Sequence, residues 1–301
     1  MKDSILKKVF TLFAGLCACL FLCFSFDTTS YAKTKGNIDT VLVEEVVTEE
    51  LDEDGEAVTE ERNIYVYTPS GYNEKTKYPV LYLLEGLHSV DNEALKNTKL
   101  LDTMIENEEI PPILVVIVPE SVYKVHTMEE IIFLTDTLYS TKTESKDRII
   151  AGFSNGAYRI WNKILPSATE VKLADIYIPM SPIGSRKLTT GKTAFQRLKK
   201  QSSRIKIINT CGNAGCEENY CDLYGGVEQM ECIVETGSEY GFLEGKNIFC
   251  YQAEGEHTWQ QVWNALQNIL PVVYGKEDVE YGGLEEIRRK GIDADKVFED
   301  L

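Results

Sequence analysis

A serine at the centre of a glycine-flanked pentapeptide is the residue of this sequence best suited to covalent chemistry. The segment Gly152-Phe-Ser-Asn-Gly156 follows an apolar run, residues 149–151, that predicts a short strand, and a helical pattern begins at Asn155. In such a turn the serine backbone is strained, and glycines two positions away prevent collisions with neighbouring backbone. The pattern therefore predicts a nucleophilic hydroxyl, Ser154 Oγ, at the top of a sheet beside the positive end of a helix.

A serine hydroxyl is a poor nucleophile at neutral pH, so it needs an imidazole to accept its proton. The chain has 3 histidines, His88, His126 and His257. In a nucleophile elbow of this type the chain order is serine, acid, histidine, and only His257 follows Ser154. We therefore expect His257 to be the general base.

The third member of such a set is a carboxylate that orients the imidazole. A glycine-rich loop after an apolar strand, residues 205–208, contains the competing acids Glu217, Glu218 and Asp222. The flanking cysteines suggest that a bridge between Cys216 and Cys221 holds the acid in place.

Backbone N–H groups complete the expected site as an oxyanion hole. One comes from the residue after the nucleophile, Asn155, and the other from the loop that follows an earlier strand, which here indicates Leu87. The substrate-binding candidates near these strand ends are Glu85, His88 and Trp259.

Apolar strands alternate with helical patterns along most of the chain. Alternating residues over 40–47 and 63–67 predict an antiparallel hairpin that turns near Asp54-Gly55, and a helix is expected over 92–107. The remaining apolar runs predict a mostly parallel central sheet with helices on both faces, in one domain. These runs cover residues 77–84, 112–118, 149–151, 175–178, 205–208 and 247–251.

The amino terminus predicts export. Three lysines precede an apolar run over residues 9–26, and Ser30-Tyr-Ala32 is a small-x-small cleavage pattern, so residues 1–32 read as a signal peptide. The alternative is an uncleaved anchor, because the run approaches the length of a membrane span. We expect one α/β domain over 33–274 and a charged tail over 275–301, either a docked helix or disordered.

Net charge and cysteine content indicate which binding partners and cross-links to expect. The net charge of −17 disfavours nucleic acid and anionic membranes as partners, because both require a basic surface. Five of the 8 cysteines lie in the last third, which in an oxidising compartment suggests one or two disulfides. The absence of a CxxC pattern argues against a zinc site, and no cofactor is expected.

These motifs resemble the esterase D family of α/β-hydrolases, which includes enterochelin, feruloyl and acetyl-xylan esterases, S-formylglutathione hydrolases and the antigen 85 mycolyltransferases. The resemblance implies an α/β-hydrolase fold and, through the mycolyltransferase branch, Glu218 as the catalytic acid with Glu217 as the alternative. Two departures are Glu85-Gly86, where many members have His-Gly, and Ala157, where a second glycine is common. The likeness extends over residues 62–270 and rests on 65–72, 78–87, 152–156, 211–213 and 255–259 with Trp263.

The expected function is a secreted serine esterase that hydrolyses carboxylic esters of small molecules or carbohydrates through an acyl-enzyme. If a sugar hydroxyl attacks the acyl-enzyme instead of water, the same site is an acyltransferase. The alternative from another class is a non-catalytic binding protein on a hydrolase scaffold. The sequence leaves the oligomeric state and the acyl group open.

Overall fold

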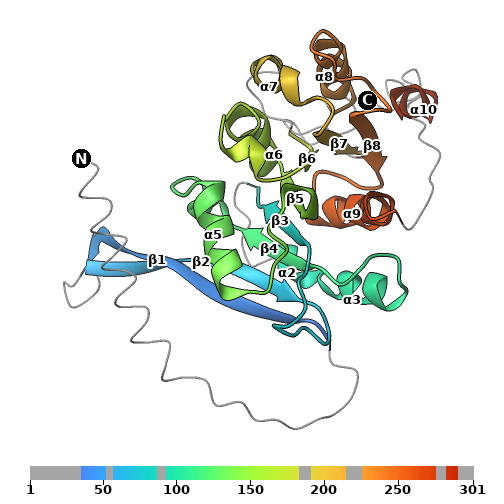
Figure 1. The fold of residues 1–301 in the computed structure, drawn as a ribbon. Helices are drawn as coiled ribbons and strands as arrows, with labels where there is room; N and C mark the ends of the chain where they lie inside the picture. Colours follow the sequence, from blue (N-terminus) through green and yellow to red (C-terminus); the bar gives the residue numbers. More distant parts are fainter. Residues whose placement is uncertain are drawn as a thin grey trace, which may run out of the picture. The chain divides into compact units, whose positions relative to one another are not determined.

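The computed structural model describes residues 35–51, 57–86, 93–182, 191–214, 226–275 and 283–290. Within these residues one sheet has the strand order β1-β2-β4-β3-β5-β6-β7-β8 (Figure 1). The strands are β1 (Asn37–Leu51), β2 (Ala57–Thr68), β3 (Val80–Leu84), β4 (Leu114–Val118), β5 (Arg148–Phe153), β6 (Ile176–Met180), β7 (Lys206–Gly212) and β8 (Ile248–Ala253).

The strand directions agree with the predicted sheet. β1 pairs antiparallel with β2, and β2 pairs antiparallel with β4. All the other pairs, from β4–β3 to β7–β8, are parallel. The predicted turn of the hairpin lies outside the described residues, but Leu51 and Ala57 pair on either side of it. Parallel strands need covering on both faces, which explains the near-continuous apolar runs in β3, β4 and β5.

Helices cover both faces of the sheet. Buried residues of α4, α5, α7, α8, α10 and the π-helical turn Ile160–Ile164 share one core with one set of strand side chains. Buried residues of α2, α3 and α9 share the core of the opposite face. The helices are α2 (Glu93–Lys96), α3 (Lys99–Glu106), α4 (Glu120–Tyr123), α5 (Met128–Leu138), α6 (Asn155–Arg159), α7 (Lys192–Leu198), α8 (Val227–Ser238), α9 (Trp259–Val273) and α10 (Gly283–Lys290).

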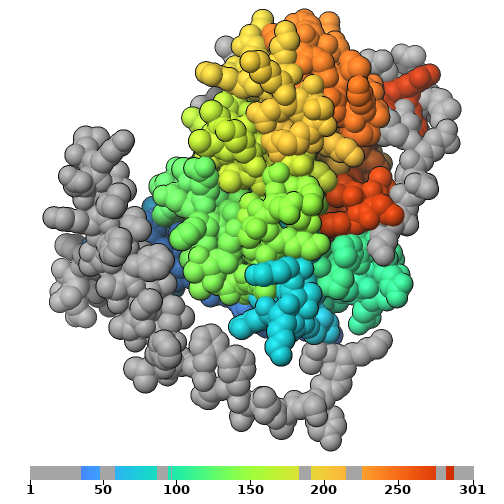
Figure 2. Space-filling view, viewed as in Figure 1, coloured from blue at the N-terminus to red at the C-terminus, as the bar shows by residue number. Residues whose placement is uncertain are grey.

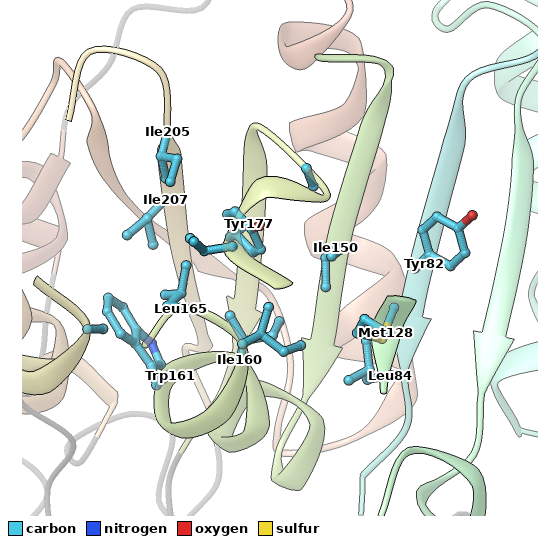
Figure 3. Close-up of a cluster of buried hydrophobic side chains, with 14 of the residues drawn as sticks. Tyr82, Leu84, Met128, Ile150, Ile160, Trp161, Leu165, Tyr177, Ile205 and Ile207 are labelled. Atoms are coloured by element: carbon cyan, nitrogen blue, oxygen red, sulfur yellow. The ribbon is translucent and has the colours of Figure 1, made fainter. Parts of the chain in front are cut away.

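The first core holds the helix after the predicted nucleophile against the middle of the sheet. Trp161 and Ile160 pack with Ile150 of β5 and Tyr177 of β6, and all four side chains are buried (Figure 3). In the space-filling view the segments from α5 to α8, coloured green to orange, lie next to one another on the visible face (Figure 2). Burying each of these large side chains contributes roughly 1.5–3 kcal/mol relative to exposure, so this packing fixes the element that begins at the nucleophile.

The predicted single helix over 92–107 is wrong in one respect, because the structure divides it into α2 and α3. Asn97 and Thr98 form a turn between them, and the Thr98 hydroxyl donates a hydrogen bond to the Leu95 carbonyl at 2.9 Å. Short polar side chains bond locally to the backbone and compete with helix continuation, which explains the interruption.

The charged carboxyl-terminal segment includes a docked helix. In α10, Leu284 and Ile287 are buried in the first core, and the Leu284 N–H donates to Glu244 Oε1 at 2.7 Å. The docked-helix alternative therefore applies to residues 283–290. No helix in the described part of the chain has the length and hydrophobicity needed to cross a bilayer.

Candidate active site

Ser154 lies at the apex of a strained turn between β5 and α6. Its backbone angles are φ 52° and ψ −111°, a left-handed φ that is unfavourable for a residue with a side chain. Its Oγ does not cap the helix that begins at the next residue. Backbone strain of this kind occurs where the surrounding structure over-determines a functional position, and it is the geometry predicted for a nucleophile elbow.

The two glycines of the pentapeptide are required by backbone contacts. A Cβ on Gly152 would lie 2.6 Å from the carbonyl carbon of Gly156, and a Cβ on Gly156 would lie 2.4 Å from the backbone oxygen of Leu84. Neither neighbour is a flexible side chain, so any larger residue would displace the turn. The elbow therefore packs directly on the end of β3.

Hydrogen bonds to the backbone hold the turn in place. The Ser154 N–H donates to the Met180 carbonyl at 2.9 Å, and the Ser154 carbonyl accepts from the Tyr158 N–H at 2.9 Å. After α6 the helix continues as a π-helical turn over Ile160–Ile164. π-helical turns are rare in proteins, and those that occur often lie near functional sites.

The loop after β3 reaches the nucleophile at Gly86. A Cβ on this glycine would be 3.2 Å from the Ser154 Cβ, so the loop backbone passes beside the elbow. The predicted oxyanion donor Leu87 and the candidate His88 follow immediately but lie outside the described residues. Asn155, the other predicted donor, opens α6, where helix N–H groups have no partner within the helix.

Glu85 is a buried carboxyl at the root of this loop. It is 3 % exposed, its Oε1 has no hydrogen-bond partner, and burial raises its pKa to about 7. Its backbone is fixed on both sides, because its N–H donates to Val118 at 3.0 Å and its carbonyl accepts from the Tyr123 hydroxyl at 2.8 Å. Glu85 is one of the predicted substrate-binding residues; its side chain is buried at the end of β3, and the substrate-binding role stays a prediction.

One polar residue that the sequence analysis did not single out, Glu120 of α4, supports the elbow. The Asn155 side-chain amide donates to Glu120 Oε1 at 2.9 Å, and Glu120 also pairs with Lys124 at 3.2 Å. Glu120 directly follows the Val118-Pro119 end of β4. An acid at the carboxyl end of a buried parallel strand was the available signal, because site residues gather at those ends.

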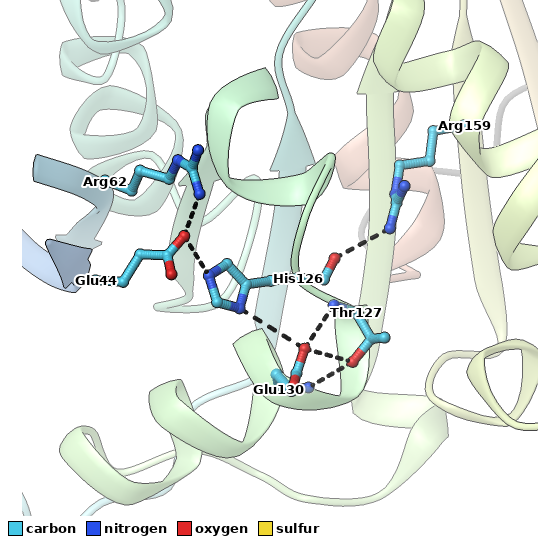
Figure 4. A network of polar contacts seen from close by, with 6 residues as sticks. All are labelled: Glu44, Arg62, His126, Thr127, Glu130 and Arg159. Carbon is cyan, nitrogen blue, oxygen red and sulfur yellow. Dashed lines mark hydrogen bonds and ion pairs between the residues drawn. The ribbon is translucent and has the colours of Figure 1, made fainter. Parts of the chain in front are cut away.

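Arg159 connects α6 to the α4 region. Its guanidinium lies 5.4 Å from the centre of the Tyr123 ring, and its Nη2 donates to the His126 carbonyl at 3.0 Å. Figure 4 shows that the His126 side chain lies between Glu44 and Glu130. Its Nε2 is 3.1 Å from Glu44 Oε1, and its Nδ1 is 3.7 Å from Glu130 Oε2. His126 is thus part of a polar network with glutamates of β1 and α5.

His257 lies beside the nucleophile strand. Its ring is 4.6 Å from the Phe153 ring, centre to centre, and Phe153 is the residue before Ser154. Trp259 packs on the other side of this group, 5.2 Å from the Phe153 ring, and is 6 % exposed. The structure therefore brings His257 and Trp259 to the elbow from a segment about a hundred residues further along the chain.

The loops that follow β7 and β8 are joined at the backbone. Asn213 Oδ1 accepts from the Gly255 N–H at 3.0 Å, and the Gly255 carbonyl accepts from the Asn213 N–H at 3.1 Å. Gly255 has φ 123°, which favours glycine. The segment that leads to Glu217 and Glu218 thus begins next to the segment that carries His257; both glutamates lie outside the described residues.

The predicted disulfides do not involve the cysteines that the structure describes. No disulfide bond joins Cys211, Cys232 and Cys250. Cys211 and Cys250 are buried in the first core, on adjacent strands. The suggested Cys216–Cys221 bridge and the competing acid Asp222 lie outside the described residues, and the bridge stays a prediction.

Comparison with known sequences gives one family match. Residues 55–126 match the Esterase family model. This segment contains the β3 strand and its Glu85-Gly86 end but neither Ser154 nor His257. No curated protein sequence matches the chain.

Solved structures share the fold over most of the chain. A feruloyl esterase module of Clostridium thermocellum, in complex with sinapinate, matches with a TM-score of 0.59 at 18% identity over 82% of this chain and 90% of that chain. The S-formylglutathione hydrolase of Staphylococcus aureus matches with a TM-score of 0.55 at 15% identity, over 81% of this chain and 100% of that chain. A ferulic acid esterase of Anaeromyces mucronatus, in complex with ferulic acid, matches with a TM-score of 0.56 at 15% identity, over 82% of this chain and 94% of that chain.

The parallel sheet, the strained serine turn and these neighbours define an α/β-hydrolase fold. Over residues 55–126 the chain is similar to the Esterase family, and over most of its length it shares its fold with solved esterases. The resemblance to the esterase family inferred from the sequence motifs is therefore confirmed.

Proposed function

We propose that this protein is a secreted serine esterase that uses Ser154, His257 and Glu218, with Glu217 as the alternative acid. The observation that carries the proposal is the convergence at one end of the sheet: Ser154 at a strained φ of 52° and the His257 ring 4.6 Å from the ring of Phe153. The joined loops after β7 and β8 support an acid from 217–218 as the third member.

The proposed reaction follows from the roles of these groups. Ser154 Oγ attacks the ester carbonyl carbon while His257 accepts its proton, and the backbone N–H groups of Leu87 and Asn155 stabilise the oxyanion. Collapse of this intermediate breaks the bond to the leaving alcohol, which takes the proton from His257. Water then attacks the acyl-enzyme with His257 again as base, and the carboxylic acid is released.

A fluorophosphonate probe tests the nucleophile. We expect covalent labelling of the folded wild-type protein at Ser154 and none of Ser154→Ala. Ser203→Ala is the control variant, because it removes an exposed serine hydroxyl between α7 and β7, and it is expected to be labelled like wild type. Labelling that persists in Ser154→Ala would overturn the assignment, and a folded wild type that is never labelled would favour the non-catalytic binding protein.

The substrate class proposed here is a small or carbohydrate-linked carboxylic ester. Two of the structural neighbours were solved with sinapinate and with ferulic acid, which makes feruloylated sugars a natural part of a test panel. The panel also includes acetylated sugars and p-nitrophenyl esters of increasing chain length. Release of free acid indicates hydrolysis, whereas transfer to an added sugar hydroxyl indicates the acyltransferase alternative.

Export is the remaining part of the proposal. It rests on residues 1–32 of the sequence, with their lysines, apolar run and small-x-small pattern. Amino-terminal sequencing of the protein recovered from the culture medium is expected to begin at Lys33. Protein retained in the membrane with Met1 intact would support the uncleaved anchor instead.

A further inference from the structure

Two consecutive residues after β6 connect the nucleophile to the helix beside the histidine. The Met180 carbonyl accepts the Ser154 N–H at 2.9 Å, as described above. The next residue, Ser181, donates its hydroxyl to Gln261 Oε1 at 3.3 Å, and Gln261 lies in the first turn of α9. The same short segment therefore contacts the elbow through its backbone and α9 through its side chain.

Ser181 has an unusual backbone conformation for a buried residue. Its φ is 49°, one of three left-handed values among the described non-glycine residues, and it is fully buried. A left-handed conformation is unfavourable for a residue with a side chain, because the Cβ approaches the following carbonyl oxygen. Its N–H donates to the Thr210 carbonyl of β7 at 2.7 Å, which holds the residue in this conformation.

Gln261 supports the segment that carries His257. Its N–H donates to the Thr258 hydroxyl that caps α9, at 3.5 Å, and a Cβ on Gly255 would lie 3.2 Å from the Gln261 Cβ. His257 stands between Gly255 and Thr258. Gln261 therefore lies against the segment on both sides of the histidine, with its Cβ beside Gly255 and its backbone N–H on the Thr258 hydroxyl.

Packing alone does not account for a glutamine at this place. Gln261 is fully buried, and its Nε2 has no hydrogen-bond partner. A buried polar group without a partner destabilises the folded protein, and an apolar side chain of similar size would avoid that cost. The amide oxygen is used, however, because it accepts the Ser181 hydroxyl.

We propose that Ser181 and Gln261 form a positioning pair that sets the separation of Ser154 and His257. The hydroxyl of Ser181 holds the first turn of α9 at a fixed place relative to Met180, and Met180 holds the nucleophile. This inference rests on the proposed function, because it assumes that proton transfer between Ser154 and His257 limits acylation. A misplacement of about 1 Å between reacting groups is enough to lower a rate on the order of a hundredfold.

Steady-state kinetics with p-nitrophenyl butyrate test the pair. Gln261→Met and Ser181→Ala each remove one partner at nearly the same volume. We expect each variant to lower kcat about tenfold or more with KM within about twofold of wild type, since substrate contacts are unchanged. We also expect the double variant to lose little more than either single variant, because one hydrogen bond is broken in all three.

Two control variants separate positioning from loss of stability. Thr135→Val removes the fully buried hydroxyl that donates to Ile131 in α5, and Gln260→Met changes the exposed neighbour of Gln261. Thr135→Val is expected to lower Tm without changing kcat, and Gln260→Met is expected to change neither. Assays are run well below the Tm of each variant, with the amount of folded enzyme measured by near-ultraviolet circular dichroism.

The outcomes distinguish the two proposals. If Ser154→Ala abolishes turnover but Gln261→Met and Ser181→Ala keep kcat within twofold, the positioning pair is wrong and the esterase proposal stands. Additive losses in the double variant, or a raised KM with kcat unchanged, also overturn the pair. If Ser154→Ala retains full turnover, the proposed nucleophile is wrong and the pair loses its basis.

Discussion

At the scale of single residues, the nucleophile turn depends on the absence of side chains at two positions. Gly152 and Gly156 face backbone atoms at 2.6 and 2.4 Å from where a Cβ would lie. Packed backbone cannot move aside as the end of a flexible side chain can. The strain at Ser154 is therefore maintained by close contact of β5, α6 and the end of β3.

Gly156→Ala tests this dependence. The new methyl group would collide with the Leu84 backbone, so we expect destabilisation of about 3 kcal/mol or more and loss of fluorophosphonate labelling. Chemical denaturation and labelling measure the two effects. Gly241→Ala is the matched control, because Gly241 has φ 83° but its nearest neighbour is 3.7 Å away, and only about 1–2 kcal/mol is expected there. Wild-type labelling of Gly156→Ala would contradict the packing argument.

Glu85 predicts a specific dependence of stability on pH. Burial raises its pKa from the ordinary value of 4.5 to about 7, so the folded protein favours the neutral carboxyl. The stability that this group contributes is fully present below pH 4.5 and is lost as the pH rises through about 7. Relative to wild type, Glu85→Gln is therefore expected to gain stability between pH 5 and pH 8, by about 2 kcal/mol.

Thermal unfolding of wild type and Glu85→Gln across this range measures the effect. Glu106→Gln, on the exposed side of α3, provides a control in which the difference from wild type is expected not to change with pH. A constant difference for Glu85→Gln would mean that the Glu85 carboxyl does not titrate in this interval.

At the scale of elements, the site depends on loops that belong to different strands. Asn213 fastens the loop after β7 to the loop after β8 by hydrogen bonds to Gly255 in both directions. One loop leads to the proposed acid and the other carries the proposed base. Their coupling is a contact between segments 42 residues apart in sequence.

Asn213→Ala removes the hydrogen bond that Asn213 Oδ1 accepts from the Gly255 N–H and leaves the backbone hydrogen bond in place. Because Asn213 is exposed, we expect a small loss of stability, about 0.5–1.5 kcal/mol, but a fall in kcat of about tenfold as the histidine loop loosens. Asn213→Asp keeps an oxygen that accepts the Gly255 N–H and is expected to retain most of kcat. The coupling would be refuted by equal kcat values for Asn213→Ala and wild type.

The amino-terminal hairpin is held to the helical layer by charges. Glu44 of β1 pairs with Arg62 of β2 and with His126, as Figure 4 shows. Burial raises the pKa of Glu44, but hydrogen bonds from Arg62 and His126 outweigh it, and the net direction is downward. The stability from this carboxylate is therefore present above pH 4.5 and is lost as the pH falls below that value.

Arg62→Leu is expected to destabilise the protein at pH 7, by about 1 kcal/mol, and to have a smaller effect at pH 3.5, where the carboxyl of Glu44 is being protonated. Unfolding curves at both pH values measure the difference. Glu45→Gln, at the exposed neighbouring position, serves as the control. An Arg62→Leu effect that is equal at both pH values would exclude the ion pair as its source.

At the scale of the whole molecule, the net charge of −17 acts on the approach of substrates. An acidic protein attracts cationic esters over several ångströms, and salt screens this attraction. We expect kcat/KM for a choline-type ester to fall as ionic strength rises from 0.01 to about 0.5 M, with no matching change for a neutral ester of equal acyl length. Equal salt dependence of kcat/KM for both esters would show that the electrostatic field of the protein does not act on substrates at the proposed active site.

Local sequence patterns were enough to predict the parallel sheet and the serine turn, and chain order was enough to select His257 as the candidate base. Those predictions use apolar runs, glycines around Ser154, and order along the chain. The folded chain was needed to show that Glu85 is buried, that Asn213 bonds to the loop before His257, and that Ser181 contacts Gln261, 80 residues away. Contacts of that kind depend on which strands become neighbours, and no local pattern records this.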